Sequence, residues 1–145
     1  MIEQVAPADI YPCLTYADAI AAIDWLCRAF GFTKRLVVPG PDGIVQHSEL
    51  SLGTGVVMVS SPRPGQQPPG KAGGNSATVS VYVSDPDQHF AQAVATGATV
   101  IQPLRDEEYG ARGYGVTDLE GHNWYFGNYR PGAYWDAPAG NAENA

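Results

Sequence analysis

The sequence predicts an α+β protein in which one βαβββ module occurs twice. Two stretches carry the same order of signals: a short extended segment, a capped helix, a glycine and three further extended segments. The repeats are offset by about 67 residues when their helix caps are aligned, a period too long for a solenoid. A chain of 145 residues is also long enough to bury a core of its own. These observations predict a duplicated half-domain.

The first predicted helix follows an extended segment at 10–16. Asp18 is the candidate N-cap, and Gly31 closes the helix. The apolar residues at helical spacing are Ile20, Ile23, Leu26, Cys27 and Phe30. Three extended segments follow at 32–39, 45–52 and 55–61, separated by the turn signals PGPDG and GTG.

The second predicted helix follows an extended segment at 77–84. Asp85 and Pro86 give an N-cap with proline at the first helical position, and Gln88 completes a capping-box spacing. The apolar stripe comprises Phe90, Val94 and Ala98, with Gly97 as the stop signal. The extended segments that follow are 99–104, 111–119 and 122–129.

The chain therefore divides into a first module at 1–61, a linker at 62–75, a second module at 76–129 and a flexible tail at 130–145. The linker is rich in proline and glycine, which favours a mobile connection. A flap over a ligand, or a hinge that lets two copies exchange halves, are the alternatives. In the tail, Tyr134-Trp135 carries enough apolar surface to fold back on the body.

The composition excludes several classes of function. A net charge of −7 argues against nucleic acid and anionic membranes as partners, and makes a neutral or cationic ligand easier to hold. The first residues show no signal peptide, and no run of 18 apolar residues occurs. Cys13 and Cys27 form no disulfide framework and are expected to be free, buried thiols. Together these features predict a cytoplasmic protein.

A histidine and a glutamate stand two positions apart in the segment QHSELSLG. In a strand, His47, Glu49 and Ser51 share one face, while Leu50 and Leu52 point to the other. The second module repeats this alternation, with a polar face of Thr78, Ser80 and Tyr82 opposite three valines. Each polar face is turned either to water, as in any half-exposed sheet, or to a ligand cavity.

Several motifs together identify a family resemblance. A helix ending in AFGF, the strand GATVIQPL and the turn DLEGHNW, within two βαβββ units, resemble the vicinal oxygen chelate superfamily of glyoxalases, extradiol dioxygenases and bleomycin-resistance proteins. The resemblance covers about residues 10–129, and HSELSLG and EEYGAR place it near the glyoxalase-like or bleomycin-resistance-like members. It implies curled sheets around a cavity, and a homodimer.

The resemblance also implies four positions for metal ligands. By strand and turn landmarks these fall at Tyr11, Glu49, Thr78 and Tyr125, of which only the glutamate is a good ligand for a divalent cation. A register slip of one residue would bring His122 or Trp124 inward instead. The usual metal centre is therefore expected to be absent, with no cofactor. A non-standard site built on His47 and Glu49 is the alternative.

The predicted function is metal-independent binding of a small organic molecule. The expected ligand-binding residues are Tyr11, Cys13, His47, Glu49, Thr78, Ser80, Tyr82, Tyr109, Arg112 and Tyr125. Arg112, on a rim loop with Tyr109, either binds an anionic group or forms an ion pair with Glu107 or Glu108. The alternative functions are an enzyme that uses His47 and Glu49, with or without metal, and a dimeric scaffold without a ligand.

Overall fold

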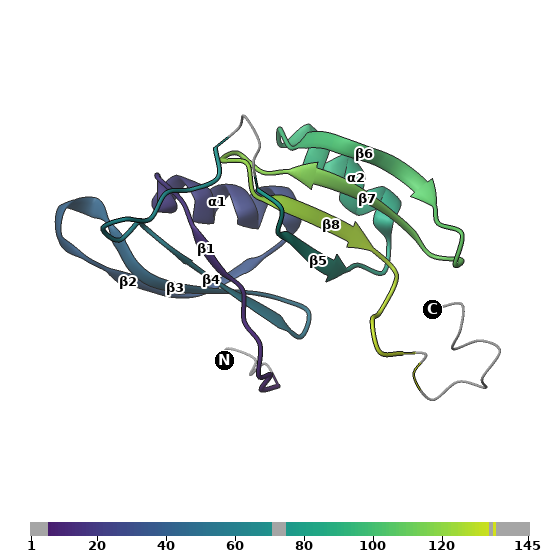
Figure 1. Ribbon diagram of the computed structural model, residues 1–145, viewed down its shortest axis with the longest axis horizontal. Helices are drawn as coiled ribbons and strands as arrows, with labels where there is room; N and C mark the ends of the chain where they lie inside the picture. Colours follow the sequence, from purple (N-terminus) through teal and green to yellow (C-terminus); the bar gives the residue numbers. More distant parts are fainter. Residues whose placement is uncertain (1–5, 71–74, 134, 136–145) are drawn as a thin grey trace.

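The computed structural model describes residues 6–70, 75–133 and 135, and it contains two four-stranded mixed sheets with one helix each (Figure 1). The first module comprises β1 (Cys13–Thr15), α1 (Ala19–Phe30), β2 (Thr33–Pro39), a 3₁₀ turn (Pro41–Gly43), β3 (Val45–Leu52) and β4 (Gly55–Ser60). The second comprises β5 (Thr78–Tyr82), α2 (Pro86–Ala95), β6 (Thr99–Asp106), β7 (Arg112–Thr117) and β8 (Asn123–Gly127). The predicted α+β class and the twofold βαβββ order are confirmed.

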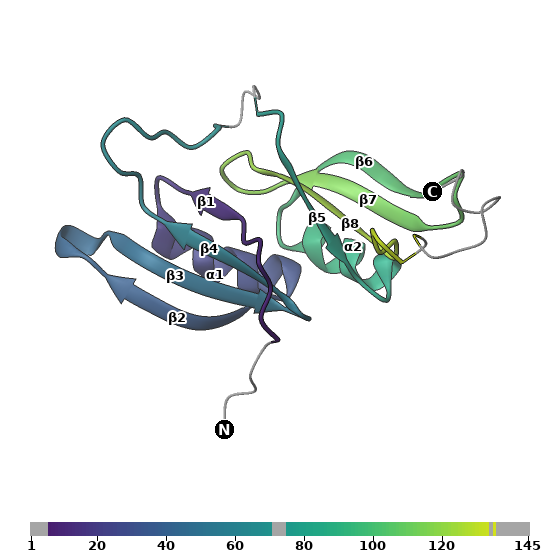
Figure 2. The same ribbon diagram turned by 60° about the horizontal axis from the view of Figure 1, so that its bottom comes forward.

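The two sheets have the same topology. The strand orders are β1-β4-β3-β2 and β5-β8-β7-β6, with a parallel first pair and antiparallel pairs beyond it. Cys13 pairs with Met58 in the first sheet, and Ser80 pairs with Tyr125 in the second. Met58 and Tyr125 therefore occupy equivalent positions in the two sheets. Figure 2 shows the two sheets side by side.

The caps that the sequence predicts are present on both helices. Asp18 accepts a hydrogen bond from the backbone amide of Ala21, and Gly31 ends α1 in the left-handed conformation (φ 86°). Asp85 likewise accepts from the amide of Gln88 at the start of α2. The apolar stripes are narrower than predicted. Ile20 is exposed, and so is Val94 on α2, because only one face of each helix contacts the sheets.

The hydrophobic core is continuous between the modules. The ring of Phe30, at the end of α1, packs on Trp124 and Phe126 of β8 with centroid distances of 5.2 and 4.6 Å. The indole N–H of Trp25 donates to the carbonyl oxygen of Thr96 at 2.9 Å, which ties α1 to the end of α2. Trp25 and Trp124 are therefore packing residues.

A buried carboxylate joins the modules at the β7–β8 turn. Asp118 accepts hydrogen bonds from the Tyr16 hydroxyl (2.5 Å) and the Trp124 indole N–H (2.9 Å). The next carboxylate, Glu120, accepts from the amides of Ala17 and Asp18 immediately before α1. The DLEGHNW turn of the second module thus holds the start of the first module's helix.

Each sheet has one face against its helix and one face away from it, which we call the open face. In the first sheet the open face carries Cys13, Glu49, Ser51 and Met58, and in the second Ser80 and Tyr125. The expectation that both cysteines are buried is wrong for Cys13, which is exposed because β1 turns it to the open face. Cys27 is half-buried, and both thiols are free.

Some expectations fall partly outside the described residues. Positions 62–70 and 75 of the linker contain no helix or strand, and 71–74 lie outside the described residues. Tyr134 and the tail from 136 onward also lie outside them. Trp135 is described, and its ring is 80% exposed.

Candidate functional site

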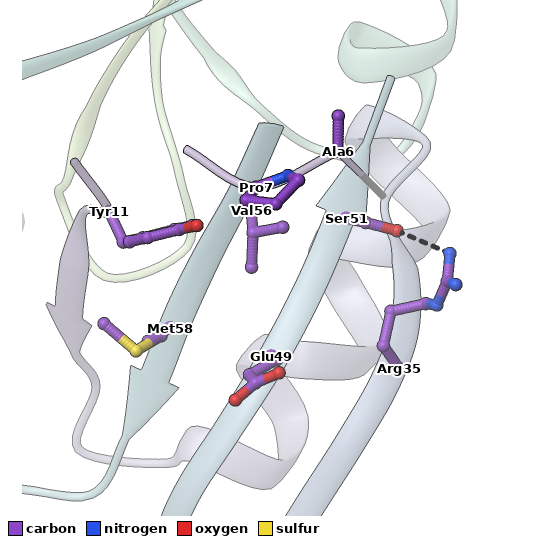
Figure 3. A pocket seen from close by; sticks show the side chains of 8 residues that line it. All are labelled: Ala6, Pro7, Tyr11, Arg35, Glu49, Ser51, Val56 and Met58. Carbon is purple, nitrogen blue, oxygen red and sulfur yellow. Dashed lines mark hydrogen bonds between the residues drawn. The ribbon is translucent and has the colours of Figure 1, made fainter. Parts of the chain in front are cut away.

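The open face of the first sheet carries a pocket of about 370 Å³ (Figure 3). The N-terminal segment closes one side of it. Tyr11 is fixed there, because its hydroxyl donates to the carbonyl oxygen of Ala8 and accepts from the amide of the same residue, each at 2.8 Å. The complete lining is Ala6, Pro7, Tyr11, Arg35, Glu49, Ser51, Val56 and Met58. The pocket thus combines an aromatic ring, a thioether, a carboxylate and a guanidinium.

The polar side of this pocket comes from two neighbouring strands. Arg35 of β2 donates to the hydroxyl of Ser51 on β3 at 3.2 Å, as Figure 3 shows. Glu49, two residues earlier on β3, forms a hydrogen bond with the imidazole of His47, in which Nε2 of the histidine lies 2.7 Å from Oε2 of the glutamate. The His47 and Glu49 side chains are 38% and 41% exposed. The predicted pair therefore exists on one face, and its glutamate reaches the pocket.

A second pocket, of about 680 Å³, lies between the two modules. It brings together three of the predicted site residues, Cys13 on β1 and Thr78 and Ser80 on β5. Asn75, Asn123 and His122 complete its polar wall. A third pocket, of about 330 Å³, is lined by Ser80 and Tyr82, and includes Arg130, whose guanidinium lies 3.7 Å from the centroid of the Tyr82 ring.

Tyr125 lies on the open face of the second sheet, away from these three pockets. Its hydroxyl donates to Glu107 Oε1 at 3.2 Å. Burial, followed by the neighbouring Tyr109 and Glu107, raises the pKa of Tyr125. Hydrogen bonding from Arg105 is the main cause that lowers the pKa of Glu107, so the tyrosine faces a carboxylate. Tyr109 itself packs edge-on against Tyr129.

Arg112 lies on the helix side of the second sheet. It shares a strand face with the buried Tyr114, and it forms ion pairs with Asp87 of α2 (3.0 Å) and Asp106 of β6 (3.2 Å). The prediction of an ion pair between Arg112 and Glu107 or Glu108 is therefore wrong. Arg112 was expected on a rim loop, but it is the first residue of β7, and the alternation of side chains along the strand turns it to the face that α2 covers.

The register also revises the match to the metal positions. Glu49 stands on β3 and pairs with Met58, whereas Tyr125 stands on β8 and pairs with Gly115. The counterpart of Tyr125 is consequently Met58, which is a soft thioether and a poor ligand for hard divalent cations. Within residues 6–70, 75–133 and 135, no three or more His, Cys, Asp or Glu side chains lie close enough to hold a metal ion.

The other two histidines serve the packing of the modules. His122 is buried, and its Nε2 lies 2.8 Å from the carbonyl oxygen of Thr15. His89 bridges the carbonyl oxygen of Phe30 (2.7 Å) and the hydroxyl of Tyr114 (2.5 Å). Neither approaches the His47–Glu49 pair.

Residues that the sequence reasoning did not select also line the first pocket. Met58 and Val56 alternate with the core residues Val57 and Val59 along β4. The same period-two signal that selected Glu49 would have selected them. Arg35 has no such signal, because a charged residue on an edge strand is equally typical of a solvated surface.

The duplicated βαβββ fold and its pocketed open sheet face define a class of protein. A family model described as the Glyoxalase/Bleomycin resistance protein/Dioxygenase superfamily matches residues 5–126. The chain belongs to this superfamily.

Individual relatives agree with this assignment. An uncharacterized protein of Mycobacterium bovis is 36% identical over 132 residues, which cover 88% of this chain and 86% of the relative. The crystal structure of TioX from Micromonospora sp. ML1 has a TM-score of 0.71 and 38% identity, over 86% of this chain and all of that one. PA1353 from Pseudomonas aeruginosa, at 21% identity and a TM-score of 0.65 over 83% and 96% of the two chains, shares the fold.

None of the helices in the described residues is long and apolar enough to cross a bilayer.

Proposed function

We propose that this protein binds a small organic molecule without a metal ion, on the open face of its first sheet. The observation that carries the proposal is the pocket formed by Tyr11, Glu49 and Met58 beneath the N-terminal segment. Its volume of about 370 Å³ falls within the range of roughly 300–1,000 Å³ that small-molecule sites occupy. An apolar lining with a few convergent polar groups is typical of such sites.

The chemistry of the side chains supports binding without metal. The positions expected for metal ligands, with Met58 as the counterpart of Tyr125, are Tyr11, Met58, Thr78 and Tyr125, which supply two phenols, a thioether and a hydroxyl. These groups are poor ligands for hard or borderline divalent cations. Membership of a superfamily that includes bleomycin-resistance proteins makes sequestration of a toxic or antibiotic-like compound the role we propose.

A homodimer is part of this proposal. The open faces of the two sheets do not cover each other within the chain, and apolar side chains are exposed beside them. Leu36 (43%) and Val38 (38%) stand on the open face of the first sheet, opposite Glu49 and His47. A second copy that covers these faces would bury this apolar surface and enclose the site.

The His47–Glu49 pair favours a second candidate function, acid–base catalysis. A carboxylate 2.7 Å from Nε2 orients the imidazole towards the pocket side of β3, where it could pass a proton to or from a substrate. The pair is solvent-accessible, and the glutamate lines the pocket, so a bound substrate would reach it.

The experiment that tests the proposal is a ligand screen on the untagged protein. Neutral and cationic antibiotics are titrated into protein with and without prior EDTA treatment, while metal content is measured by mass spectrometry. We expect stoichiometric binding that EDTA does not change. Met58→Trp, which fills the pocket, should abolish it, whereas Ile44→Trp on the β2–β3 loop should not. Binding that requires near-stoichiometric metal and disappears in His47→Ala would contradict the proposal.

A further inference from the structure

The open face of the second sheet has glycine residues at positions where the open face of the first sheet has side chains. Gly113 pairs with Gly127 and Gly115 pairs with Tyr125 between β7 and β8. At the matching place in the first sheet, β3 and β4 pair Glu49 with Met58. The ionisable side of the first open face is thus replaced by bare backbone in the second.

The ring of Tyr125 lies across this glycine backbone. A Cβ atom added to Gly113 would come within 2.6 Å of the ring carbon Cζ, and one added to Gly127 within 3.0 Å of Cε1. The first distance is shorter than Cβ atoms in folded proteins show, and the second is tighter than most Cβ contacts. The carbonyl oxygens of Phe126 (2.8 Å from the Gly113 Cβ position) and Arg112 (2.9 Å from that of Gly127) add to the crowding, so glycine is the residue that leaves room for the ring here. The ring covers both residues, which are themselves buried.

The hydroxyl group fixes the far end of the ring. Tyr125 donates to Glu107 (3.2 Å), which also accepts from Arg105 Nε (3.0 Å) and Gln102 Nε2 (3.1 Å). The Glu107 side chain is only 13% exposed. Because the ring is held at both ends, a ligand that packs on it meets a surface already in place, and little conformational entropy is lost on binding.

The Tyr125 side chain is only partly buried, so part of its ring reaches solvent. Within the part of the chain that the structure describes, no other aromatic ring or cation stacks on Tyr125. Tyr82, on the same open face, differs because the Arg130 guanidinium already covers it at 3.7 Å. Aromatic faces attract planar π-systems, and such pairs contribute about 0.5–1.5 kcal/mol beyond the area they bury.

We propose that Tyr125 is a stacking platform, held by Gly113, Gly127 and Glu107, for a planar aromatic ligand that is neutral or cationic. This platform is separate from the first-sheet pocket, so the inference goes beyond the proposed function and adds a second site with its ligand class. The net charge of −7 disfavours an anionic ring system, whereas the charge of Glu107 beside the platform is offset by its ion pair with Arg105.

Proflavine, a planar cationic acridine, tests the platform in a fluorescence titration, beside the non-planar cation amantadine measured by calorimetry. Wild-type protein is expected to prefer proflavine. Tyr125→Phe keeps the ring and should stay within about twofold, whereas Tyr125→Leu should weaken proflavine binding about five- to tenfold and leave amantadine unchanged. Phe90→Leu, which removes an aromatic ring from the helix side of the same module, is the control and should behave as wild type.

Gly113→Ala separates ring position from ring chemistry. It should displace the Tyr125 ring and weaken the binding of proflavine as much as Tyr125→Leu does, although the tyrosine remains.

Equal affinities of the wild type, Tyr125→Phe and Tyr125→Leu for proflavine would overturn the platform while small-molecule binding stands. Failure of the wild type to bind proflavine, amantadine or any compound of the antibiotic panel would overturn both proposals. Thermal unfolding of each variant identifies any that fails to fold, and the comparison of Tyr125→Phe with Tyr125→Leu does not depend on Gly113→Ala.

Discussion

The two modules share a topology but differ in what surrounds their helices. In α1, seven of the twelve residues are buried, because its end packs on Trp124 and Phe126 of the other module as well as on its own sheet. In α2, only Pro86 and Ala93 of ten residues are buried. Both helices contact the opposite module, since His89 of α2 reaches the carbonyl oxygen of Phe30, but only α1 is largely buried. A duplicated backbone thus does not imply a duplicated core.

The open faces differ as strongly. The first carries His47, Glu49 and Met58, which are able to form hydrogen bonds, exchange protons or contact a soft apolar group. The second carries a glycine floor and one fixed tyrosine ring. The strand pairing is the same in both sheets, so the two modules differ in the side chains of their open faces rather than in their backbone arrangement.

Removal of Phe30 is expected to have the largest effect. Phe30→Ala deletes a fully buried ring that contacts Trp124 and Phe126, and should lower the free energy of unfolding by about 3–5 kcal/mol. Phe90→Ala, on the partly exposed α2, should cost only about 1–2 kcal/mol. Urea unfolding of both variants measures the difference. Equal losses would show that the two helices contribute alike.

The turn between β7 and β8 should matter more than the turn between β3 and β4. Asp118→Asn weakens charge-assisted hydrogen bonds to Tyr16 and Trp124, and should destabilise the protein by about 1.5–3 kcal/mol. Thr54→Ala at the exposed tip of the first module's hairpin should change stability by less than about 0.5 kcal/mol. If chemical denaturation gave similar midpoints for both variants, Asp118 would not be the tie between the modules.

His89 should make stability depend on pH. Burial lowers its pKa in the folded protein below the ordinary value of about 6.5, so the unfolded chain binds the proton more readily. Stability should therefore be complete above about pH 6.5 and decline as the pH falls from there towards the folded pKa. Thermal midpoints between about pH 5.5 and 7.5 measure this slope, and His89→Gln should flatten it. A slope that persists in the variant would assign the effect to other groups.

The smallest effect is expected at Arg112. Its ion pairs with Asp87 and Asp106 are exposed, and they connect α2 to its own sheet only. Arg112→Gln should lower the thermal midpoint slightly in dilute buffer, and the difference should vanish near 1 M salt, where the Debye length is about 3 Å. A large drop that salt does not affect would indicate a contribution from the packing of the Arg112 stem.

Much of the fold could be predicted because its signals are local. Asp18, Gly31 and Asp85 act within one helical turn, and alternation along β3 determines which residues accompany Glu49. The duplication then gives the same architecture twice. Such features depend on neighbours three or four positions away, which the sequence displays directly.

The candidate site was less predictable because it depends on long-range pairing. Arg112 was expected at a rim, but the register of β7 turns it to α2. The distribution of the expected ligand residues over separate pockets follows from how the sheets lie, which no local pattern specifies. The role of Gly113 was hidden for a similar reason, since its significance arises only from the ring that crosses it.

The contact of Glu120 with Ala17 and Asp18 has a consequence for how the chain assembles. Glu120 of the second module accepts hydrogen bonds from the backbone just before α1 of the first module, so each module is a binding partner for the other. The peptide from 61 to 70, which connects the modules, takes no part in these hydrogen bonds. Its contribution is to raise the effective concentration of one half around the other. A chain cut within that peptide should still reassemble from its two fragments, with an affinity that rises with their concentration.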